Sequence, residues 1–326
     1  MTAAGRTDPA EAEVLGYFES LSNWGRWGTD DELGTINHIT PDVRVRAAGL
    51  VRLGESVSCG WDIDPRDRAD PHSPPPLRMY LQTGQGLCDG NRVYSDYMRP
   101  GERQASAHEW VGLQFHGYSQ THLDGLAHIF WDARMYNDRP AELVTAADGA
   151  TANSVHRLRH GITTRGVLVD AARHRGVDWL GPGESVGAEE LREILREQHV
   201  ELGPGDAVLL RTGAARARRE RGADDVEAAG QPGWQASCLP VFHDHDTAVV
   251  GADVSQDAIP SGYDEVRFPL HAVGISALGL CLIDNCDLEE LARRCAELGR
   301  WEFLLTVSPL RLVGGSGSPV NPIATF

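Results

Sequence analysis

Four short apolar runs alternate with charged segments in the second half of the chain, and this alternation limits the fold more than any other feature. The runs are residues 165–172, 206–213, 247–253 and 278–284. Uninterrupted apolar runs of this length are typical of strands buried on both faces, as in parallel sheets. Segments 188–198 and 285–299 have helical character, and Asp287 and Glu290 have the spacing of a capping box. The pattern predicts an α/β protein.

Outside these runs we expect one compact domain with a short extension before it. Residues 1–22 form an amphipathic lead-in, and no later stretch is long enough to serve as a linker. Residues 77–99 fit a strand and a turn, without a clear pattern. We therefore place a single catalytic domain over residues 23–326.

The charge composition excludes several classes of function. All 30 basic residues are arginine, against 47 acidic residues, which gives a net charge of −17. Nucleic acids and anionic membrane surfaces repel such a chain, so we expect neither as a partner. A chain without lysine cannot form a Schiff base, and it cannot bind phosphates as a P-loop does.

Three features favour a cytoplasmic location. No segment reaches the roughly 18 apolar residues that a membrane span requires. The N-terminus is acidic and lacks the apolar centre of a signal peptide. The six cysteines include no CxxC pair, which favours free thiols in a reducing compartment.

One apparent catalytic motif is misleading. Residues 183–187, GESVG, match the GxSxG string of serine hydrolases. That motif requires a buried strand that leads directly into the serine, and the preceding DWLGP is not such a strand. We expect Ser185 or Gly187 to begin the next helix instead. No covalent route through serine, cysteine or lysine is therefore expected.

The informative segment is THLDGLAH, residues 121–128. In an extended strand, His122 and Asp124 lie on one face with Cα atoms about 6.6 Å apart. One imidazole nitrogen and one carboxylate oxygen can then bind a single divalent cation. If Gly125 begins a helical turn, His128 returns to the same side, as a ligand or as a base for water. The alternative is two core histidines and a capping aspartate.

The segment resembles the HxGTHxDxxxH motif of the metal-dependent cyclase and hydrolase superfamily, which includes bacterial kynurenine formamidases and isatin hydrolases. Similar stretches run along most of the chain, at residues 23–37, 127–140, 165–170, 205–213, 282–292 and 315–324. The resemblance implies a swivelling β/β/α fold with a mixed sheet and flanking helices. It also implies zinc or manganese at the site, and a homodimer or homotetramer.

Carried over to this chain, the motif implies that His122 and Asp124 are metal ligands and that His128 is the general base. The family's first histidine falls on Tyr118, and its glycine falls on Gln120. A neutral tyrosine is a poor ligand. We expect Tyr118 to be catalytic instead, donating its hydroxyl to the substrate or to water, because a phenol is protonated at neutral pH.

His116, two residues before Tyr118, is the nearest substitute for the missing histidine. A straight strand would place it roughly 20 Å from His122. The chain would have to fold back, without the glycine that eases such a turn in the family motif. We therefore group His116 with the substrate-binding residues.

Residues far from the motif complete the expected site. The family draws further ligands from a downstream histidine and an acid about a dozen residues later, and His271 and Asp284 lie in the matching region. Helix packing and helix capping are their alternative roles. Trp24, Trp27 and Asn37 can line a pocket, since indole faces suit a planar or ring substrate. Packing of the N-terminal segment on the core is the alternative.

These features predict a metal-dependent hydrolase of a small-molecule substrate. Metal-activated water would open a cyclic or planar amide, imide or lactone. A natural-product cyclase or dehydratase that uses the same site, with Tyr118 as the acid, is one alternative. A non-catalytic binding protein of the same fold is the other.

Overall fold

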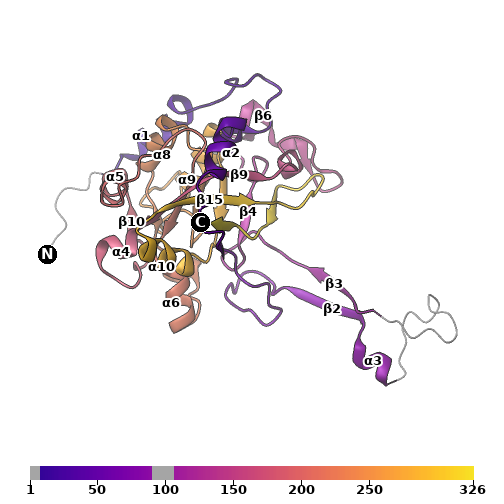
Figure 1. Ribbon diagram of the computed structural model, residues 1–326. Helices are drawn as coiled ribbons and strands as arrows, with labels where there is room; N and C mark the ends of the chain where they lie inside the picture. The colour runs from indigo at the N-terminus through magenta and orange to yellow at the C-terminus, as the bar shows by residue number, and fades with distance from the viewer. Residues whose placement is uncertain (1–7, 90–105) are drawn as a thin grey trace.

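A nine-stranded mixed sheet forms the centre of the computed structural model, which describes residues 8–89 and 106–326 (Figure 1). In spatial order its strands are β1 (Ser56–Ser58), β17 (Ile323–Thr325), β15 (Glu302–Val307), β9 (Ile162–Asp170), β11 (Ala207–Arg211), β13 (Val249–Ala252), β14 (Cys281–Asp284), β4 (His122–Asp124) and β16 (Gly317–Pro319). Strands β9, β11, β13 and β14 are parallel and correspond to the four apolar runs. The expected α/β fold with a mixed sheet is confirmed.

Antiparallel strands extend this parallel centre on both sides. Strand β15 pairs with β9, and β17 and β1 follow beyond it. On the other side β4 pairs with β14, and β16 pairs with β4. Strand β4, which carries the motif, therefore lies beside the carboxyl end of the last parallel strand.

Helices pack around the sheet. They are α1 (Glu11–Ser20), α2 (Pro41–Ala48), α4 (Ala171–Arg175), α5 (Ala188–Glu197), α6 (Ala214–Arg221), α7 (Val226–Ala229), α8 (Cys238–Asp244), α9 (Pro269–Val273) and α10 (Glu289–Leu298). Helix α5 buries Leu191 and Ile194, and α10 buries Leu291 and Cys295, so each turns one apolar stripe inward. Within residues 8–89 and 106–326, no helix combines the length and the apolar character that a membrane crossing needs.

Shorter elements connect the larger ones. The 3₁₀ turns are η1 (Gly34–His38), η3 (Tyr136–Asp138), η4 (Ala141–Leu143) and η5 (Val155–Leu158), and η6 (Gly274–Leu278) is a π-helical turn. Small two-stranded sheets are β5 (Arg134–Met135) with β6 (Arg139–Pro140), β7 (Val144–Thr145) with β8 (Gly149–Ala150), and β10 (Ser185–Val186) with β12 (Gly233–Trp234). Gly187 is the N-cap of α5, so the GESVG string ends at a helix start, as expected.

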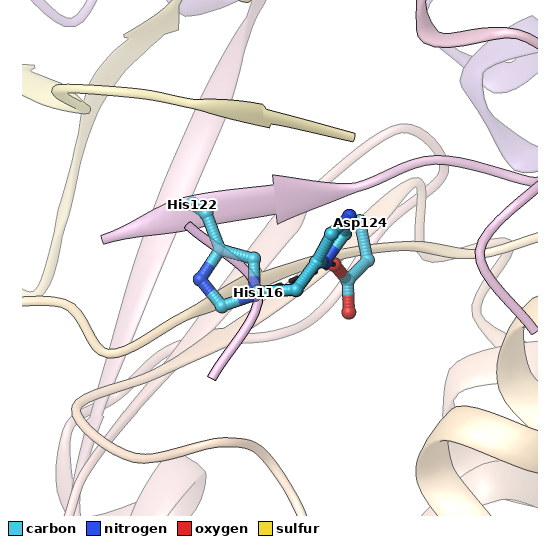
Figure 2. A group of neighbouring side chains, drawn as sticks. All are labelled: His116, His122 and Asp124. Atoms are coloured by element: carbon cyan, nitrogen blue, oxygen red, sulfur yellow. Dashed lines mark ion pairs between the residues drawn. The ribbon is translucent and has the colours of Figure 1, made fainter. Parts of the chain in front are cut away.

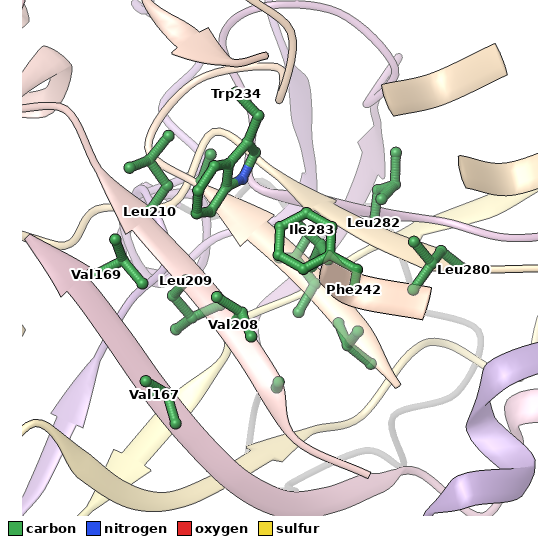
Figure 3. Close-up of a cluster of buried hydrophobic side chains, with 14 of the residues drawn as sticks. Val167, Val169, Val208, Leu209, Leu210, Trp234, Phe242, Leu280, Leu282 and Ile283 are labelled. Atoms are coloured by element: carbon green, nitrogen blue, oxygen red, sulfur yellow. The ribbon is translucent and has the colours of Figure 1, made fainter. Parts of the chain in front are cut away.

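The core lies between the sheet and its helices. Fully buried side chains such as Val167, Leu209 and Leu282 come from the strands, and Trp234 and Phe242 pack edge to face beside them (Figure 3). Burying one large apolar side chain contributes about 1.5–3 kcal/mol. Packing in this layer fixes the positions of the parallel strands. It therefore also fixes the residues at their carboxyl ends.

The expected lead-in overlaps helix α1, which packs on the body of the protein. Val14 is completely buried and Tyr17 nearly so. Helix α1 contacts α9 and η6, the two elements that come just before β14 in the chain. A boundary at residue 22 stays a prediction.

A two-stranded antiparallel hairpin projects from the body of the molecule (Figure 1). Its strands are β2 (Leu77–Gln82) and β3 (His108–Gly112), and helix α3 (Gly84–Cys88) follows β2 at the outer end. We call the two strands the arm. The expected strand at 77–99 is present as β2, and residues 90–99 lie outside the described part of the chain.

Candidate functional site

Strand β4 carries the two central motif residues. Its register places Asp284 of β14 opposite His122, and Gly317 of β16 opposite Asp124. His122 and Asp124 are buried on one face, with His122 Nε2 3.4 Å from Asp124 Oδ1 (Figure 2). This shared face is the one that the i, i+2 spacing predicts. A Cβ atom at Gly317 would lie 2.7 Å from the His116 ring, so this glycine leaves room for the imidazole.

His116 lies against Asp124, as Figure 2 shows. Its Nδ1 atom is 2.8 Å from Asp124 Oδ1, and the centroids of the His116 and His122 rings are 5.2 Å apart. The chain folds back at Gly117, whose φ is 146° and where a Cβ atom would lie 2.6 Å from Asp70 Oδ2. The expected separation of roughly 20 Å for a straight strand is therefore wrong. The structure groups His116 with the candidate metal ligands.

Side-chain hydrogen bonds hold the loop between His116 and β4 against the end of β14. Asn285 Nδ2 donates to the carbonyl oxygens of Gly117 at 2.7 Å and Gln120 at 3.2 Å. Thr121 Oγ1 donates to the carbonyl oxygen of Asn285 at 2.7 Å. The position of His116 thus depends on a residue far away in the sequence.

His128 returns to the same side of β4, as the helical-turn hypothesis predicts. Its backbone N–H donates to the Gly125 carbonyl at 3.0 Å, and its Nε2 atom lies 3.5 Å from Asp124 Oδ2. The ring stacks on His116, with centroids 3.9 Å apart and planes 5° apart. Burial lowers the pKa of His128 to about 4, an effect that Asp124 opposes only in part. The imidazole is therefore neutral at pH 7 and free to accept a proton.

Two residues from later in the chain complete the cluster. His271, on α9, has its Nε2 atom 3.3 Å from Asp284 Oδ2 and 3.5 Å from Asp124 Oδ2. Asp284 Oδ2 is also 3.9 Å from His122 Nε2. The structure thus brings together all four residues that the sequence analysis expects to bind metal.

A hydrogen bond on the far side of the ring orients two of these histidines. His122 Nδ1 lies 2.8 Å from the Gln120 carbonyl oxygen, and His271 Nδ1 lies 2.6 Å from Asp257 Oδ2. Both partners are acceptors, so each Nδ1 carries a proton, and each Nε2 offers its lone pair to a metal once that nitrogen is deprotonated. This is the usual arrangement at histidines that bind metal.

Gln256 and Asp257 support the cluster, and the sequence analysis missed both. Gln256 Nε2 donates to Asp284 Oδ1 at 2.8 Å, and Asp257 Oδ1 accepts from the Leu270 backbone N–H at 2.7 Å. Both side chains are fully buried. The available signal was their polar character just after the apolar run 247–253.

Asp124 is the centre of the cluster and the group that most needs a cation. Its side chain is buried, and within the described residues neither carboxylate oxygen accepts a well-aligned hydrogen bond, although imidazole nitrogens lie as close as 2.8 Å. Uncompensated burial of a carboxylate is costly. His116, His122 and Asp124 place ligand atoms within 4.8 Å of one another, and so do Asp124, His271 and Asp284. This set of nitrogen and carboxylate oxygen donors fits a divalent metal ion.

The pKa values of the histidines around Asp124 also indicate that the cluster favours positive charge. Burial by itself lowers the pKa of His122, but Asp124 and Asp284 outweigh it and raise that pKa to about 9. Burial also opposes protonation of His271, yet Asp284, Asp124 and Asp257 raise its pKa well above the ordinary value. Without a metal, the cluster therefore holds protons in place of a metal's positive charge.

Tyr118 lies near His271, and its hydroxyl bonds to a residue of α7. The hydroxyl donates to Glu227 Oε1 at 2.6 Å, and Arg267 Nη2 donates to Glu227 Oε2 at 2.5 Å. Burial, together with the bond to Glu227, raises the pKa of the phenol above its ordinary value. Tyr118 is therefore a protonated hydrogen-bond donor at neutral pH.

A pocket opens beside Tyr118 at the carboxyl ends of β13 and β14. Its lining includes Trp61, Tyr118, Arg218, Asp253 and Asn285. Ligands of α/β sheets bind at the carboxyl ends of parallel strands. The Arg218 guanidinium lies 4.1 Å from the centroid of the Trp61 ring, which gives the pocket an aromatic and cationic wall. Trp61 is a further residue that the sequence analysis did not single out.

The three N-terminal residues that we expected at a substrate pocket have other partners. Trp24 Nε1 donates to a backbone carbonyl of η6 at 2.7 Å, and Asn37 Nδ2 donates to Asp31 Oδ1 at 2.8 Å. The Trp27 ring meets His38 edge to face at 5.0 Å. None of the contacts described for these residues joins them to the cluster. The geometry supports the alternative, in which they pack the N-terminal segment on the core.

Comparison with known proteins agrees with this fold. Residues 69–257 match a family model described as "Putative cyclase". A crystal structure described as a novel cyclase is 31% identical, with a TM-score of 0.85, and the match covers 94% of this chain and 100% of that one. The chain belongs to the cyclase family. The resemblance inferred from the motif is confirmed.

The cyclase-family fold of this protein extends to isatin hydrolases. One, solved with the product analogue thioisatinate, is 18% identical with a TM-score of 0.56, over 85% of this chain and 93% of that one. Isatin hydrolase A from Labrenzia aggregata, solved with benzyl benzoate, is 16% identical with a TM-score of 0.59, over 85% and 94%. At this level of identity the similarity establishes the fold alone. No curated protein matches the chain.

Proposed function

We propose that this cyclase-family protein is a metal-dependent hydrolase that opens a cyclic or planar amide, imide or lactone. The observation that carries the proposal is Asp124, a buried carboxylate that faces four imidazoles and accepts no well-aligned hydrogen bond from them. A packed core gains nothing from such a group, since its desolvation is not repaid by hydrogen bonds. A cation at this point would repay it.

The proposed ligands are His122, Asp124, His271 and Asp284, joined by His116. Asp124 belongs to both groups of three ligands, so both depend on its carboxylate. Imidazole nitrogens together with carboxylate oxygens suit Zn²⁺ or Mn²⁺. When bound, such an ion supplies a Lewis acid that polarises a carbonyl and makes water nucleophilic at neutral pH.

His128 is the proposed general base. Its neutral ring takes a proton from the attacking water, and the imidazolium that forms is stabilised by the Asp124 carboxylate 3.5 Å away. Stacking on His116 fixes the plane of the ring during this transfer. The same proton then passes to the leaving nitrogen or oxygen of the opened ring.

Tyr118 is the proposed donor to the substrate carbonyl. Its phenol remains protonated, and it can exchange the Glu227 carboxylate for a substrate oxygen as its acceptor. Arg267 keeps Glu227 neutralised when that exchange occurs. In this role the hydroxyl stabilises the developing oxyanion.

Two arguments favour hydrolysis over cyclisation. The sequence has no lysine and no credible serine or cysteine nucleophile motif, so water is the simplest attacking group. The isatin hydrolases that share the fold carry hydrolysis in their names. The pocket beside Tyr118, with its Trp61 wall, is the proposed site of the ring.

The test is turnover of candidate lactones, imides and cyclic amides in ¹⁸O-labelled water by the metal-loaded protein. We expect one label in a new carboxylate. Metal-stripped protein should be inactive, His128→Ala should be slower by about 10²–10⁴, and Tyr118→Phe should keep the metal while losing rate. A product isomeric with its precursor, or lighter by one water, would show a cyclase or dehydratase. Ligand binding by metal-free protein without any turnover would show a binding protein.

A further inference from the structure

A hydrogen-bond donor and an acceptor lie side by side at the edge of the pocket that Tyr118 lines. The Tyr118 hydroxyl donates to Glu227 Oε1 at 2.6 Å. Glu227 belongs to α7, whose first residue, Val226, lines the same pocket. Glu227 itself lines a second pocket, and Gly230 lines both. The pair therefore lies at the boundary of the two pockets, where a bound molecule can reach both side chains.

The protonation states of the two side chains are opposite and fixed. Burial and the bond to Glu227 raise the pKa of the Tyr118 phenol. The bonds that Tyr118 and Arg267 donate lower the pKa of the Glu227 carboxyl. At neutral pH the phenol therefore keeps its proton to donate, and the ionised carboxylate can only accept.

Arg267 fixes the orientation of the carboxylate. Its Nη2 atom donates to Glu227 Oε2 at 2.5 Å, and its guanidinium lies 4.7 Å from the centroid of the Phe268 ring. Oε1 is thereby left on the Tyr118 side. A carboxylate oxygen has more than one lone pair, so Oε1 can accept from a further donor. The pair is thus a preformed donor and acceptor for one edge of a ligand.

An unsubstituted cyclic amide or imide offers the complementary edge. Its ring holds the carbonyl and the N–H cis, so an acceptor and a donor lie next to each other. Tyr118 can donate to the carbonyl while Glu227 Oε1 accepts from the N–H, and one bond between side chains is exchanged for two bonds to the ring. A lactone has an oxygen in place of the N–H. Glu227 would then lose the Tyr118 bond without a replacement, which is unfavourable.

We propose that Glu227 is a specificity-determining residue, which selects rings with an N–H beside the carbonyl over lactones of the same shape. The proposal rests on the proposed function, in which Tyr118 binds the carbonyl. The Glu227 side chain is 36% exposed, so water compensates in part for a missing donor. We therefore expect a preference of about 10–100-fold, as for one hydrogen bond to a charged group. A buried polar site achieves roughly 10⁴–10⁵-fold.

Isothermal titration calorimetry of the full-length protein with isoindolinone and phthalide tests the proposal. The two probes share one fused ring and one carbonyl, and differ in an N–H in place of the ring oxygen. The protein is first dialysed against a chelator, so that neither probe is consumed. This treatment spares the pair, because Tyr118 and Glu227 belong to neither group of ligands. Isoindolinone should bind about 10–100-fold more tightly than phthalide.

Three variants separate the roles of the side chains. Glu227→Met keeps the length of the side chain and removes the acceptor, so the two probes should bind with about equal affinity. Asp225→Asn is the matched control on the same segment, where Asp225 Oδ1 lies 2.9 Å from His72 Nε2, and it should keep the wild-type preference. Tyr118→Phe should weaken both probes and keep the preference, because both probes have the carbonyl.

Circular dichroism of all four proteins checks that they are folded, which the exposed position of Glu227 favours. Equal affinities in the wild type, no measurable binding of isoindolinone, or a preference that survives Glu227→Met overturns the proposal. In the last case Glu227 only holds α7 against Tyr118. A preference without turnover in ¹⁸O-labelled water would count against the hydrolase alone, and turnover without the preference would count against the role of Glu227 alone.

Discussion

The His/Asp cluster and the arm both contain side chains without suitable neighbours, but the cluster is polar and buried whereas the arm is apolar and exposed. At the cluster, the buried carboxylate of Asp124 accepts no well-aligned hydrogen bond, while Asp257 and Gln256 already orient its neighbours. On the arm, apolar side chains such as Trp110 are half exposed on a hairpin that has two strands within the described residues. The cluster would be stabilised by a cation, whereas the apolar side chains of the arm would be stabilised by packing against another surface.

The largest expected effect breaks the cluster at its centre. Asp124→Asn keeps the shape of the side chain but removes the charge that both groups of ligands share. Metal affinity should fall by more than the roughly 10–100-fold that loss of an outer hydrogen bond costs, and turnover should disappear. Elemental analysis of untagged protein after dialysis against Zn²⁺ or Mn²⁺ checks this. Wild-type metal content in the variant would remove Asp124 from the site.

The second effect separates the base from the ligands. His128→Ala should lower turnover by about 10²–10⁴ and leave metal content nearly unchanged, because His128 belongs to neither ligand group. Steady-state kinetics and elemental analysis on the same preparation measure both quantities. A variant that loses its metal would show that His128 is a ligand.

The third effect tests whether the surroundings of the cluster preorganise it. Asp257→Asn keeps the packing but weakens the hydrogen bond that holds the proton on His271 Nδ1. Metal affinity should fall by about 10–100-fold, with the fold intact by circular dichroism. A chelator titration against the wild type measures this change. An unchanged affinity would mean that His271 needs no orienting partner.

The smallest effect concerns the metal-free protein and pH. The folded-state pKa of His122 is raised to about 9, above the roughly 6.5 of an unfolded chain. The stabilisation from its proton is therefore fully present below about pH 6.5 and is lost as pH rises through 9. Thermal unfolding between pH 6.5 and 9.5 should show a fall in Tm of a few degrees. The fall should be smaller in metal-loaded protein, where the ion takes the place of the proton.

Asp124→Asn is the control for this pH dependence, because it removes the largest source of the raised pKa of His122. Its metal-free Tm should vary less over the same range than that of the wild type. An equal slope in both proteins would assign the effect to other groups.

The parallel centre of the fold was predictable because strands that are buried on both faces have continuous apolar sequences. Strands β9, β11, β13 and β14 lie on the four runs, and α5 and α10 lie on the charged segments. The shared face of His122 and Asp124 follows from strand geometry alone. These features depend on neighbours in sequence, which is why a single chain reveals them.

Features that depend on distant contacts were not predictable in the same way. His116 reaches Asp124 because Gly117 turns the chain and Asn285, far along the sequence, holds the loop. An ungapped alignment with the family motif placed Tyr118, and not His116, at the position of the first histidine. Asp257 orients His271 through a tertiary contact that the sequence spacing of the two residues does not predict.

The expected capping box at the start of α10 also failed. The helix begins after Leu288, which provides no side-chain cap, and the Asp287 carboxylate pairs with Arg219. Asp287 Oδ1 accepts from the Glu289 backbone N–H at 3.5 Å, and its other oxygen pairs with Arg219, so the carboxylate bonds to the first turn without forming the box. The arm gave no clear pattern either, because in the isolated chain both faces of its strands are exposed.

The central claim is that the His/Asp cluster binds a divalent cation, and anomalous diffraction from crystals grown with Zn²⁺ or Mn²⁺ tests it most directly. We expect an anomalous peak about 2.0–2.2 Å from a carboxylate oxygen of Asp124 and from Nε2 of His122, the distances typical of such ligands. Peaks only at surface carboxylates, with the oxygens of Asp124 left without a metal neighbour, would contradict the claim.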